Sequence, residues 1–188
     1  EETRQLLQET QKAYRTQVPE LLLTALTQTL CEWKGDRALT VALEGHGRES
    51  LFPELDLSRT VGWFTSLYQV CLRLPESVDA GACIKAVKEQ LRAVPQHGLG
   101  YGVLRYFARE ALPAPTSGVL FNYLGRVDDG QEAGLFDISS DPVPADRSGA
   151  NAHIHELEIV PMILNDSLQV EWRFSGQRYD IATQEQLL

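Results

Sequence analysis

Two spacings of apolar residues alternate along the chain, one typical of helices and the other of strands. Leu7, Thr10 and Tyr14 lie on one helical stripe, which predicts a helix over about the first dozen residues. Pro19 fits the first turn of a second helix, whose apolar face comprises Leu22, Leu26, Leu30 and Trp33. Gly35-Asp36 ends that pattern.

The following segments alternate between strand and helix. The apolar run 38–43 and the β-branched and aromatic run 65–74 are each typical of a strand. Ser77 or Asp79 can cap the next helix, which Pro95 ends and in which the apolar residues recur at helical spacing: Ile84, Val87, Leu91 and Val94. The glycine-rich segment 98–102 precedes a predicted helix near 104–110, and 119–124 is a further predicted strand.

The last third of the chain contains a long loop and a hairpin. Residues 125–150 are rich in Gly, Asp, Ser and Pro and are predicted to form a loop. A hairpin is predicted from 153–164 and 167–175, with Asn165-Asp166 at its turn, and a helix from 183 to 188. With no internal repeat or linker, we interpret the 188 residues as one domain of the α/β class, a piece of a longer protein, in which helices pack against a mixed sheet.

Composition narrows the function classes. The formal net charge is -9, and the 17 Lys and Arg residues form no basic cluster, which argues against nucleic-acid binding. No apolar run is long enough to span a membrane and no secretory signal opens the chain, so we expect a soluble cytoplasmic protein. The three cysteines, Cys31, Cys71 and Cys83, have apolar neighbours and are predicted to be buried free thiols.

The most informative candidate is the segment Glu44 to Glu49, EGHGRE, which directly follows the apolar run 38–43. A carboxylate at the end of a buried strand, next to flexible glycines, is suited to presentation in a cleft, where burial would raise its pKa and let it exchange protons near neutrality. Glu44 and His46 share a side if the backbone stays extended. The alternative is a structural Glu44 paired with Arg48, Arg59 or Arg73.

Two further segments have mainly structural interpretations when taken alone. In Arg59 to Thr65, RTVGWFT, the rings of Trp63 and Phe64 are predicted to line the core or a cleft. Pro95 to Gly102, PQHGLGYG, has closely spaced glycines but no Lys-Ser/Thr pair, so it lacks a nucleotide-binding fingerprint. A tight backbone crossing or a channel wall fits these glycines better.

Polar residues that follow later strands are the remaining candidates. In Phe121 to Gly125, FNYLG, the Asn122 amide and the Tyr123 phenol could hydrogen-bond a developing oxyanion, or could equally satisfy backbone groups in a corner. His153 and His155 lie on one predicted strand face, but no third ligand stands at a suggestive spacing, so no metal site is expected.

In this order, the segments EGHGRE, RTVGWFT, PQHGLGYG and FNYLG resemble the epimerization domains of nonribosomal peptide synthetases, within the condensation-domain superfamily. Pro19 to Leu26, PELLLTAL, resembles a further segment of that family. The resemblance extends over residues 1–188 but covers only the C-terminal lobe of the family's domain. It implies a chloramphenicol-acetyltransferase-like lobe, in which helices flank a mixed β-sheet.

The resemblance also implies a mechanism. Such domains convert an L-aminoacyl or L-peptidyl thioester on a carrier protein into its D-epimer, in the biosynthesis of peptide antibiotics. Glu44 would be one of two proton-transfer groups, and Asn122 and Tyr123 would position the thioester or stabilise its enolate. The channel for the phosphopantetheine arm would be lined by a larger set: His46, Arg48, Trp63, Gly98, Gly100 and Tyr101.

The resemblance further implies which parts lie outside this chain. The second proton-transfer group is a histidine in a His-His-x-x-x-Asp-Gly motif of the N-terminal lobe, and this chain has no such motif. We therefore expect the lobe alone to be inactive. No cofactor would bind directly, because the substrate arrives on the 4'-phosphopantetheine arm, and the partners would be the carrier protein, the N-terminal lobe and neighbouring synthetase domains.

Two other functions remain open on sequence grounds. A condensation-type domain forms an amide bond on the same scaffold, although the EGHGRE and PxxGxGYG patterns favour epimerization. A non-catalytic lobe could instead dock carrier or tailoring proteins, although the presence of Glu44, Asn122 and Tyr123 argues against it.

Overall fold

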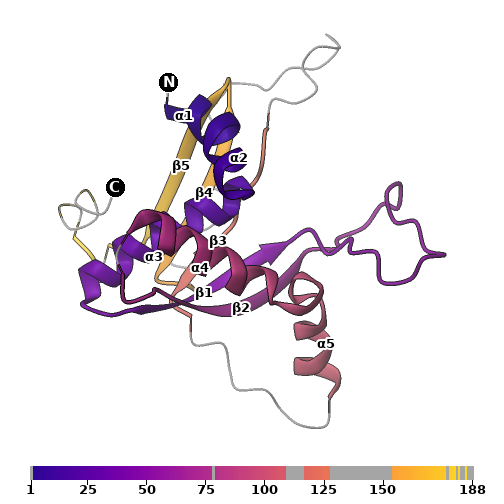
Figure 1. The fold of residues 1–188 in the computed structure, drawn as a ribbon. Coiled ribbons are helices and arrows are strands. Elements are labelled where there is room, and N and C mark those ends of the chain that lie inside the picture. The colour runs from indigo at the N-terminus through magenta and orange to yellow at the C-terminus, as the bar shows by residue number, and fades with distance from the viewer. Residues whose placement is uncertain are drawn as a thin grey trace, which may run out of the picture.

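A five-stranded mixed sheet is the centre of the computed structural model, which describes residues 2–77, 79–108, 117–127, 154–176, 178–180, 182 and 185. The strands lie in the order β2-β1-β3-β4-β5 (Figure 1). Their bounds are β1 (Ala38–Gly45), β2 (Ser66–Arg73), β3 (Val119–Phe121), β4 (Leu157–Leu164) and β5 (Ser167–Phe174). The β1–β3 and β3–β4 pairs are parallel, whereas β1–β2 and β4–β5 are antiparallel. The predicted α/β class is confirmed.

The N-terminal helices follow the predicted pattern closely. Residues 2–14 are helical as α1 (Glu2–Gln5), a π-helical turn η1 (Leu6–Thr10) and α2 (Gln11–Tyr14). The main helix, α3 (Val18–Lys34), has Pro19 in its first turn, where a missing N–H costs nothing. The Glu20 carboxylate accepts a hydrogen bond of 2.7 Å from the backbone N–H of Gln17, which caps the helix start. Gly35 ends the helix at φ 67°, a conformation that glycine adopts without strain.

The next helix begins after Asp79, one of the two predicted capping residues. Its side chain accepts a 2.9 Å hydrogen bond from Ala82 N–H. Helix α4 (Ala80–Arg92) is followed by a 3₁₀ turn, η2 (Pro95–Gly98), and by α5 (Gly100–Phe107). Since α5 begins earlier than predicted, Gly100 and Gly102 lie inside a helix with open space where a Cβ would be. The expectation of a tight crossing was therefore wrong for these two glycines.

The strands match the predictions with shifted ends. Strand β3 is shorter than the predicted 119–124, although Asn122 and Leu124 still donate backbone hydrogen bonds of 3.0 Å to Ile159 and Pro161 of β4. The predicted hairpin is confirmed as β4 and β5, and Asn165 and Asp166 adopt positive φ at its turn. Residues 128–150 of the predicted loop 125–150 and His153 lie outside the described residues, as does most of the predicted C-terminal helix.

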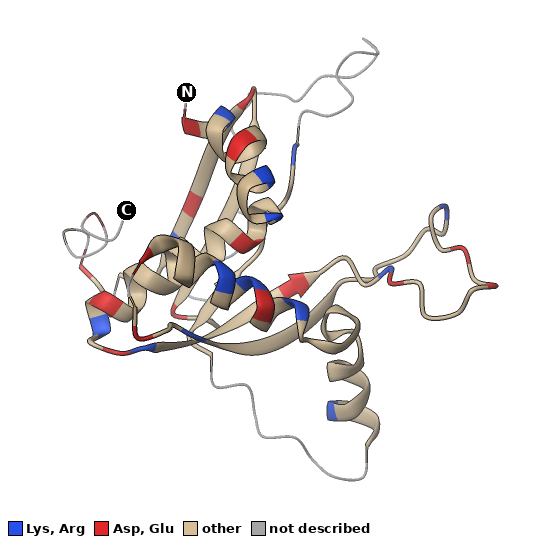
Figure 2. Cartoon of the chain, viewed as in Figure 1, with Lys and Arg blue, Asp and Glu red and all other residues tan. Residues whose placement is uncertain are grey.

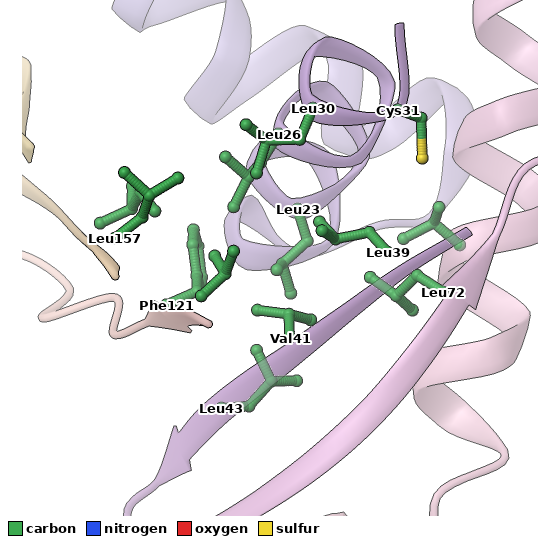
Figure 3. Close-up of a cluster of buried hydrophobic side chains, with 13 residues drawn as sticks. Leu23, Leu26, Leu30, Cys31, Leu39, Val41, Leu43, Leu72, Phe121 and Leu157 are labelled. Carbon is green, nitrogen blue, oxygen red and sulfur yellow. The ribbon is translucent and has the colours of Figure 1, made fainter. Parts of the chain in front are cut away.

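The core forms where α3 packs on the sheet (Figure 3). Leu23 of α3 points toward β1, whereas Leu26 and Leu30 lie nearer the side of Phe121 and Leu157. The same cluster contains Leu39, Val41 and Leu43 of β1 and Leu72 of β2. Burying each leucine stabilises the fold by about 1.5–3 kcal/mol. This packing fixes where β1 and β3 end, and so where the residues after them lie.

Two segments extend away from this core (Figure 1). One is the arm, which we define as residues 46–65 between β1 and β2, and the other is α5, which has no buried residue. Both carry exposed apolar side chains: Phe52, Val61 and Trp63 on the arm, and Tyr106 and Phe107 on α5. Trp63 is 92% exposed, so of its two predicted placements, in the core or on a cleft wall, the core was wrong. No helix among the described residues is both long and apolar enough to cross a membrane.

Charged side chains of both signs are intermixed over the described elements (Figure 2). Figure 2 shows basic and acidic positions on the same helices and on the arm, without a continuous basic face in this view.

The cysteines differ in their exposure, and this difference can be measured. Cys31 and Cys83 are buried free thiols as predicted, but Cys71 is exposed on β2, which corrects the prediction for that residue. Burial raises the pKa of the Cys31 and Cys83 thiols, so less thiolate is present at neutral pH.

We expect iodoacetamide to alkylate Cys71 roughly tenfold faster than Cys31 and Cys83. Peptide mass spectrometry checks this, and equal rates in urea provide the control; equal rates in native buffer would contradict the assignment.

Candidate functional site

Glu44 and Asn122 meet at one edge of the sheet. Strands β1 and β3 run parallel with Leu43 opposite Phe121, so the residues that follow these two emerge side by side. The Asn122 Nδ2 donates a 2.7 Å hydrogen bond to Oε2 of Glu44. This contact joins the EGHGRE and FNYLG segments, which are far apart in the sequence.

The alternative of an ion-paired Glu44 is not supported. Among the described residues, no ion pair joins Glu44 to Arg48, Arg59 or Arg73. Arg48 instead holds the base of the arm, since it donates hydrogen bonds to the carbonyls of Leu57 and Thr60. Its guanidinium also lies 4.2 Å from the centre of the Phe64 ring, a cation–π distance.

Glu44 is exposed in this chain, so the predicted burial of its carboxylate was wrong for the lobe by itself. The physical reason is its place at the open end of β1, where Asn122 covers only one carboxylate oxygen.

A cavity of about 230 Å³ lies next to Glu44. It opens between the start of α3, the end of α4 and the ends of β1 and β3, and its lining mixes polar side chains with apolar ones, among them Leu23, Leu43, Leu91 and Phe121. Tyr68 and Tyr123 add two phenols, and burial raises the pKa of both, so both remain protonated hydrogen-bond donors at neutral pH. A larger cavity of about 450 Å³ lies by Arg37 and Leu74, where β1 begins, and contains none of the predicted site residues.

An ion pair closes one side of the cavity near Glu44. Arg92 Nε lies 2.8 Å from Glu20 Oε1, and Arg92 Nη2 donates a 2.7 Å hydrogen bond to the Arg15 carbonyl. Both charges are thus satisfied by protein groups, which indicates a structural role for the pair. The role of Arg92 could not be predicted, because a basic residue in the last turn of a helix is common.

Glu49 is a second acidic residue of the site, and no role for it was predicted from the sequence. Its carboxylate lies 3.3 Å from His46 Nε2 and 3.1 Å from His97 Nδ1, and its side chain is only 20% exposed. His46 therefore contacts Glu49. The signal for this contact was present in the EGHGRE and PQHG segments, but sequence spacing does not show that two loops meet.

The turn before α5 is tightly built. Gly98 has φ 78°, and a Cβ at this position would overlap the Tyr68 ring, which confirms the predicted close crossing at this glycine. Gln96 and His97 also adopt positive φ, at 45° and 49°. A left-handed conformation costs roughly 1–2 kcal/mol for each residue other than glycine, so neighbouring contacts must hold this turn.

The structure brings together only some of the predicted site residues. Glu44, Asn122 and Tyr123 lie at one edge of the sheet, and Gly98 contacts Tyr68, which shares the cavity with Glu44 and Tyr123. Trp63 and Arg48 lie on the arm, and Gly100 and Tyr101 lie on α5, so none of these four lines this cavity.

This arrangement is suited to proton transfer. A carboxylate that is oriented by an amide at the mouth of a cavity can accept a proton from carbon, and a neutral phenol beside it can donate a hydrogen bond to a nearby oxyanion. No group of His, Cys, Asp or Glu that could hold a metal ion occurs in the part of the chain that the structure describes.

Substitution of Gly98 tests the close crossing against Tyr68. We expect Gly98→Ala to lower the free energy of unfolding by about 1–3 kcal/mol, because the methyl group meets the ring and alanine disfavours positive φ. Gly100→Ala is the matched control, since it adds the same methyl group in open space within a helix and should stabilise by up to about 1 kcal/mol. Urea unfolding measures both, and equal midpoints would contradict the described turn.

Comparisons with known proteins agree with this fold and these motifs. The Condensation domain family matches residues 1–188. The chain is 43% identical, over 100% of its length, to one of the linear gramicidin synthase proteins of Brevibacillus parabrevis, but spans only 4% of that protein. It is 34% identical to the epimerization domain from the third module of tyrocidine synthetase B, with a TM-score of 0.88 over 98% of this chain and 42% of that one.

A further solved structure shares the fold alone. The first condensation domain of the CDA synthetase is 18% identical, with a TM-score of 0.64 over 99% of this chain and 41% of that chain. The predicted chloramphenicol-acetyltransferase-like lobe is therefore confirmed. This chain belongs to the Condensation domain family of nonribosomal peptide synthetases.

Proposed function

We propose that this chain is the C-terminal lobe of an epimerization domain, which inverts the α-carbon of an L-aminoacyl or L-peptidyl thioester held on a carrier protein. The observation that carries the proposal is the hydrogen bond between Glu44 and Asn122, beside the 230 Å³ cavity that Tyr123 also lines. The bond joins the EGHGRE and FNYLG segments, and both resemble segments of epimerization domains. The 34% identity to the tyrocidine synthetase B epimerization domain supports it.

Inversion requires a proton to leave one face of the α-carbon and another to reach the opposite face. Glu44 would remove or deliver the proton on one face. Since Asn122 occupies Oε2 of Glu44, Oε1 is the oxygen available to the α-carbon. As the C–H bond breaks, its electron pair moves to the thioester and an enolate oxygen forms, which the neutral Tyr123 phenol can stabilise by donating a hydrogen bond.

The group on the opposite face would come from the N-terminal lobe, as the family's histidine motif implies. The substrate would reach Glu44 on the phosphopantetheine arm of a carrier protein in the cytoplasm. Residues 46–65 and α5 carry exposed apolar side chains, which fit contact with further parts of the synthetase, because such side chains are commonly covered in larger assemblies.

Condensation-type amide formation is the second candidate, because the first condensation domain of the CDA synthetase has the same fold. The two functions differ in product. An epimerization domain yields D-aminoacyl carrier protein without extending the peptide, whereas a condensation domain joins two carrier-bound groups.

Glu44→Gln tests the proposed proton-transfer group in the natural protein that contains this chain. The glutamine amide oxygen can still accept the Asn122 hydrogen bond, but it cannot take a proton from carbon. We expect formation of the D-epimer from an L-aminoacyl carrier protein to fall by about 10²–10⁴-fold. Chiral analysis of the released amino acid measures this. Glu54→Gln on the arm is the control, and an unchanged rate in Glu44→Gln removes Glu44 from the mechanism.

The 188-residue chain by itself provides a second test. We expect it neither to form the D-epimer nor to exchange the α-proton with deuterium oxide, because it supplies one proton-transfer group and leaves Glu44 in solvent. Mass spectrometry of the aminoacyl group detects deuterium incorporation. Measurable incorporation would contradict the division of the site between two lobes.

A further inference from the structure

We propose that Glu49 is a positioning residue for this reaction: through its contacts with His46 and His97, it ties the EGHGRE segment to the turn before α5 and holds Glu44 at its cavity. This inference rests on the proposed function. We call the three side chains Glu49, His46 and His97 the clasp.

Each oxygen of the Glu49 carboxylate lies close to one imidazole ring. His46 Nδ1 accepts a 2.9 Å hydrogen bond from Arg48 N–H, which leaves its Nε2, 3.3 Å from Glu49 Oε1, to carry a proton. His97 Nδ1 lies 3.1 Å from the other oxygen, Oε2. The carboxylate therefore lies between the two rings.

His46, on one side of the clasp, lies two residues after Glu44 in the chain. Gly45, which follows Glu44, lies so close to the η2 turn that a Cβ there would be 3.7 Å from the His97 carbonyl oxygen. At Gly47, a Cβ would overlap the carbonyl of Phe64 at the other end of the arm. The backbone on either side of His46 is thus packed against both flanking segments, and its imidazole is fixed to Glu49.

His97, on the other side of the clasp, is part of the cavity wall. His97 lines the cavity that Glu44 and Tyr68 also line, and Gly98 packs against the Tyr68 ring. Burial and, to a smaller extent, the charge of Glu49 raise the pKa of the Tyr68 phenol, which agrees with a carboxylate near this wall.

The turn that bears His97 requires such a contact. Gln96 and His97 both have positive φ. This turn is held by the Leu99 N–H to Gln96 carbonyl bond of 3.1 Å, by Gly98 on Tyr68, and by the His97 contact to Glu49. Loss of the last contact would free the turn to relax toward ordinary backbone angles, which would shift the wall beside Glu44.

The experiment uses the natural protein that contains this chain and begins with Glu49→Gln. The amide oxygen can accept from one imidazole, but the NH₂ group faces the N–H of the other. We expect kcat for D-epimer formation to fall about 10–100-fold with KM within about twofold, because misplacement of a reacting group lowers the rate without removing substrate contacts. Amide hydrogen exchange without substrate should become at least about fivefold faster at residues 45–50 and 96–99.

Two substitutions at His97 separate the side-chain contact with Glu49 from the backbone conformation. His97→Asn keeps an N–H donor at the position of Nδ1 and tolerates positive φ, so kcat should stay within about threefold of the parent. His97→Gly tolerates positive φ but has no donor, so it should reproduce the loss in Glu49→Gln. Glu54→Gln, an equal change of charge on the arm, is the control for both measurements.

Each outcome decides the proposal. If amide hydrogen exchange is unchanged in both Glu49→Gln and His97→Gly, the clasp does not hold the two segments together. If amide hydrogen exchange is faster but kcat is unchanged, Glu49 has no positioning role. If the parent forms no D-epimer while exchange responds as expected, the proposed function fails and the clasp is supported. If Glu49→Gln does not fold, the His97→Asn and His97→Gly pair decides, and equal kcat in these two variants overturns the proposal.

Discussion

The parallel pairing of β1 with β3 is the constraint on which the candidate site depends. It sets Leu43 opposite Phe121, so Glu44 and Asn122 emerge together at one sheet edge. The leucines of α3 hold this pair of strands from one side, and the same helix begins at the cavity beside Glu44. Core packing and site geometry therefore share the same residues, and a shift in strand register would separate the carboxylate from its amide partner.

Most of the fold could be predicted from the sequence because its signals are local. The apolar faces of α3 and α4 follow helical spacing, Asp79 and Gly35 mark helix ends, and the β4–β5 hairpin has its turn at Asn165-Asp166. The start of α5 could not be predicted, because glycines at 98, 100 and 102 have the same propensity in sequence. Only Gly98, which meets the Tyr68 ring, is needed for a close crossing.

The candidate site could be predicted in its residues but not in its contacts. Glu44, Asn122 and Tyr123 were identifiable because each follows an apolar run. The Glu44–Asn122 bond and the Glu49–His97 contact join segments that approach each other only through the strand order and the path of the arm. Spacing along the chain contains no information on that approach, which is why Glu49 received no role and Trp63 was expected to be packed.

The exposure of Glu44 agrees with a site whose parts come from two lobes. In this chain the carboxylate is already oriented by Asn122, with one oxygen available and two neutral phenols on the neighbouring cavity wall. What the described part of the chain does not provide is removal of water from that carboxylate. A second lobe that covered the open end of β1 would supply both the desolvation that makes Glu44 a stronger base and the opposing proton donor. Orientation and desolvation would then come from different halves, so catalysis would begin only when the two halves close around the substrate.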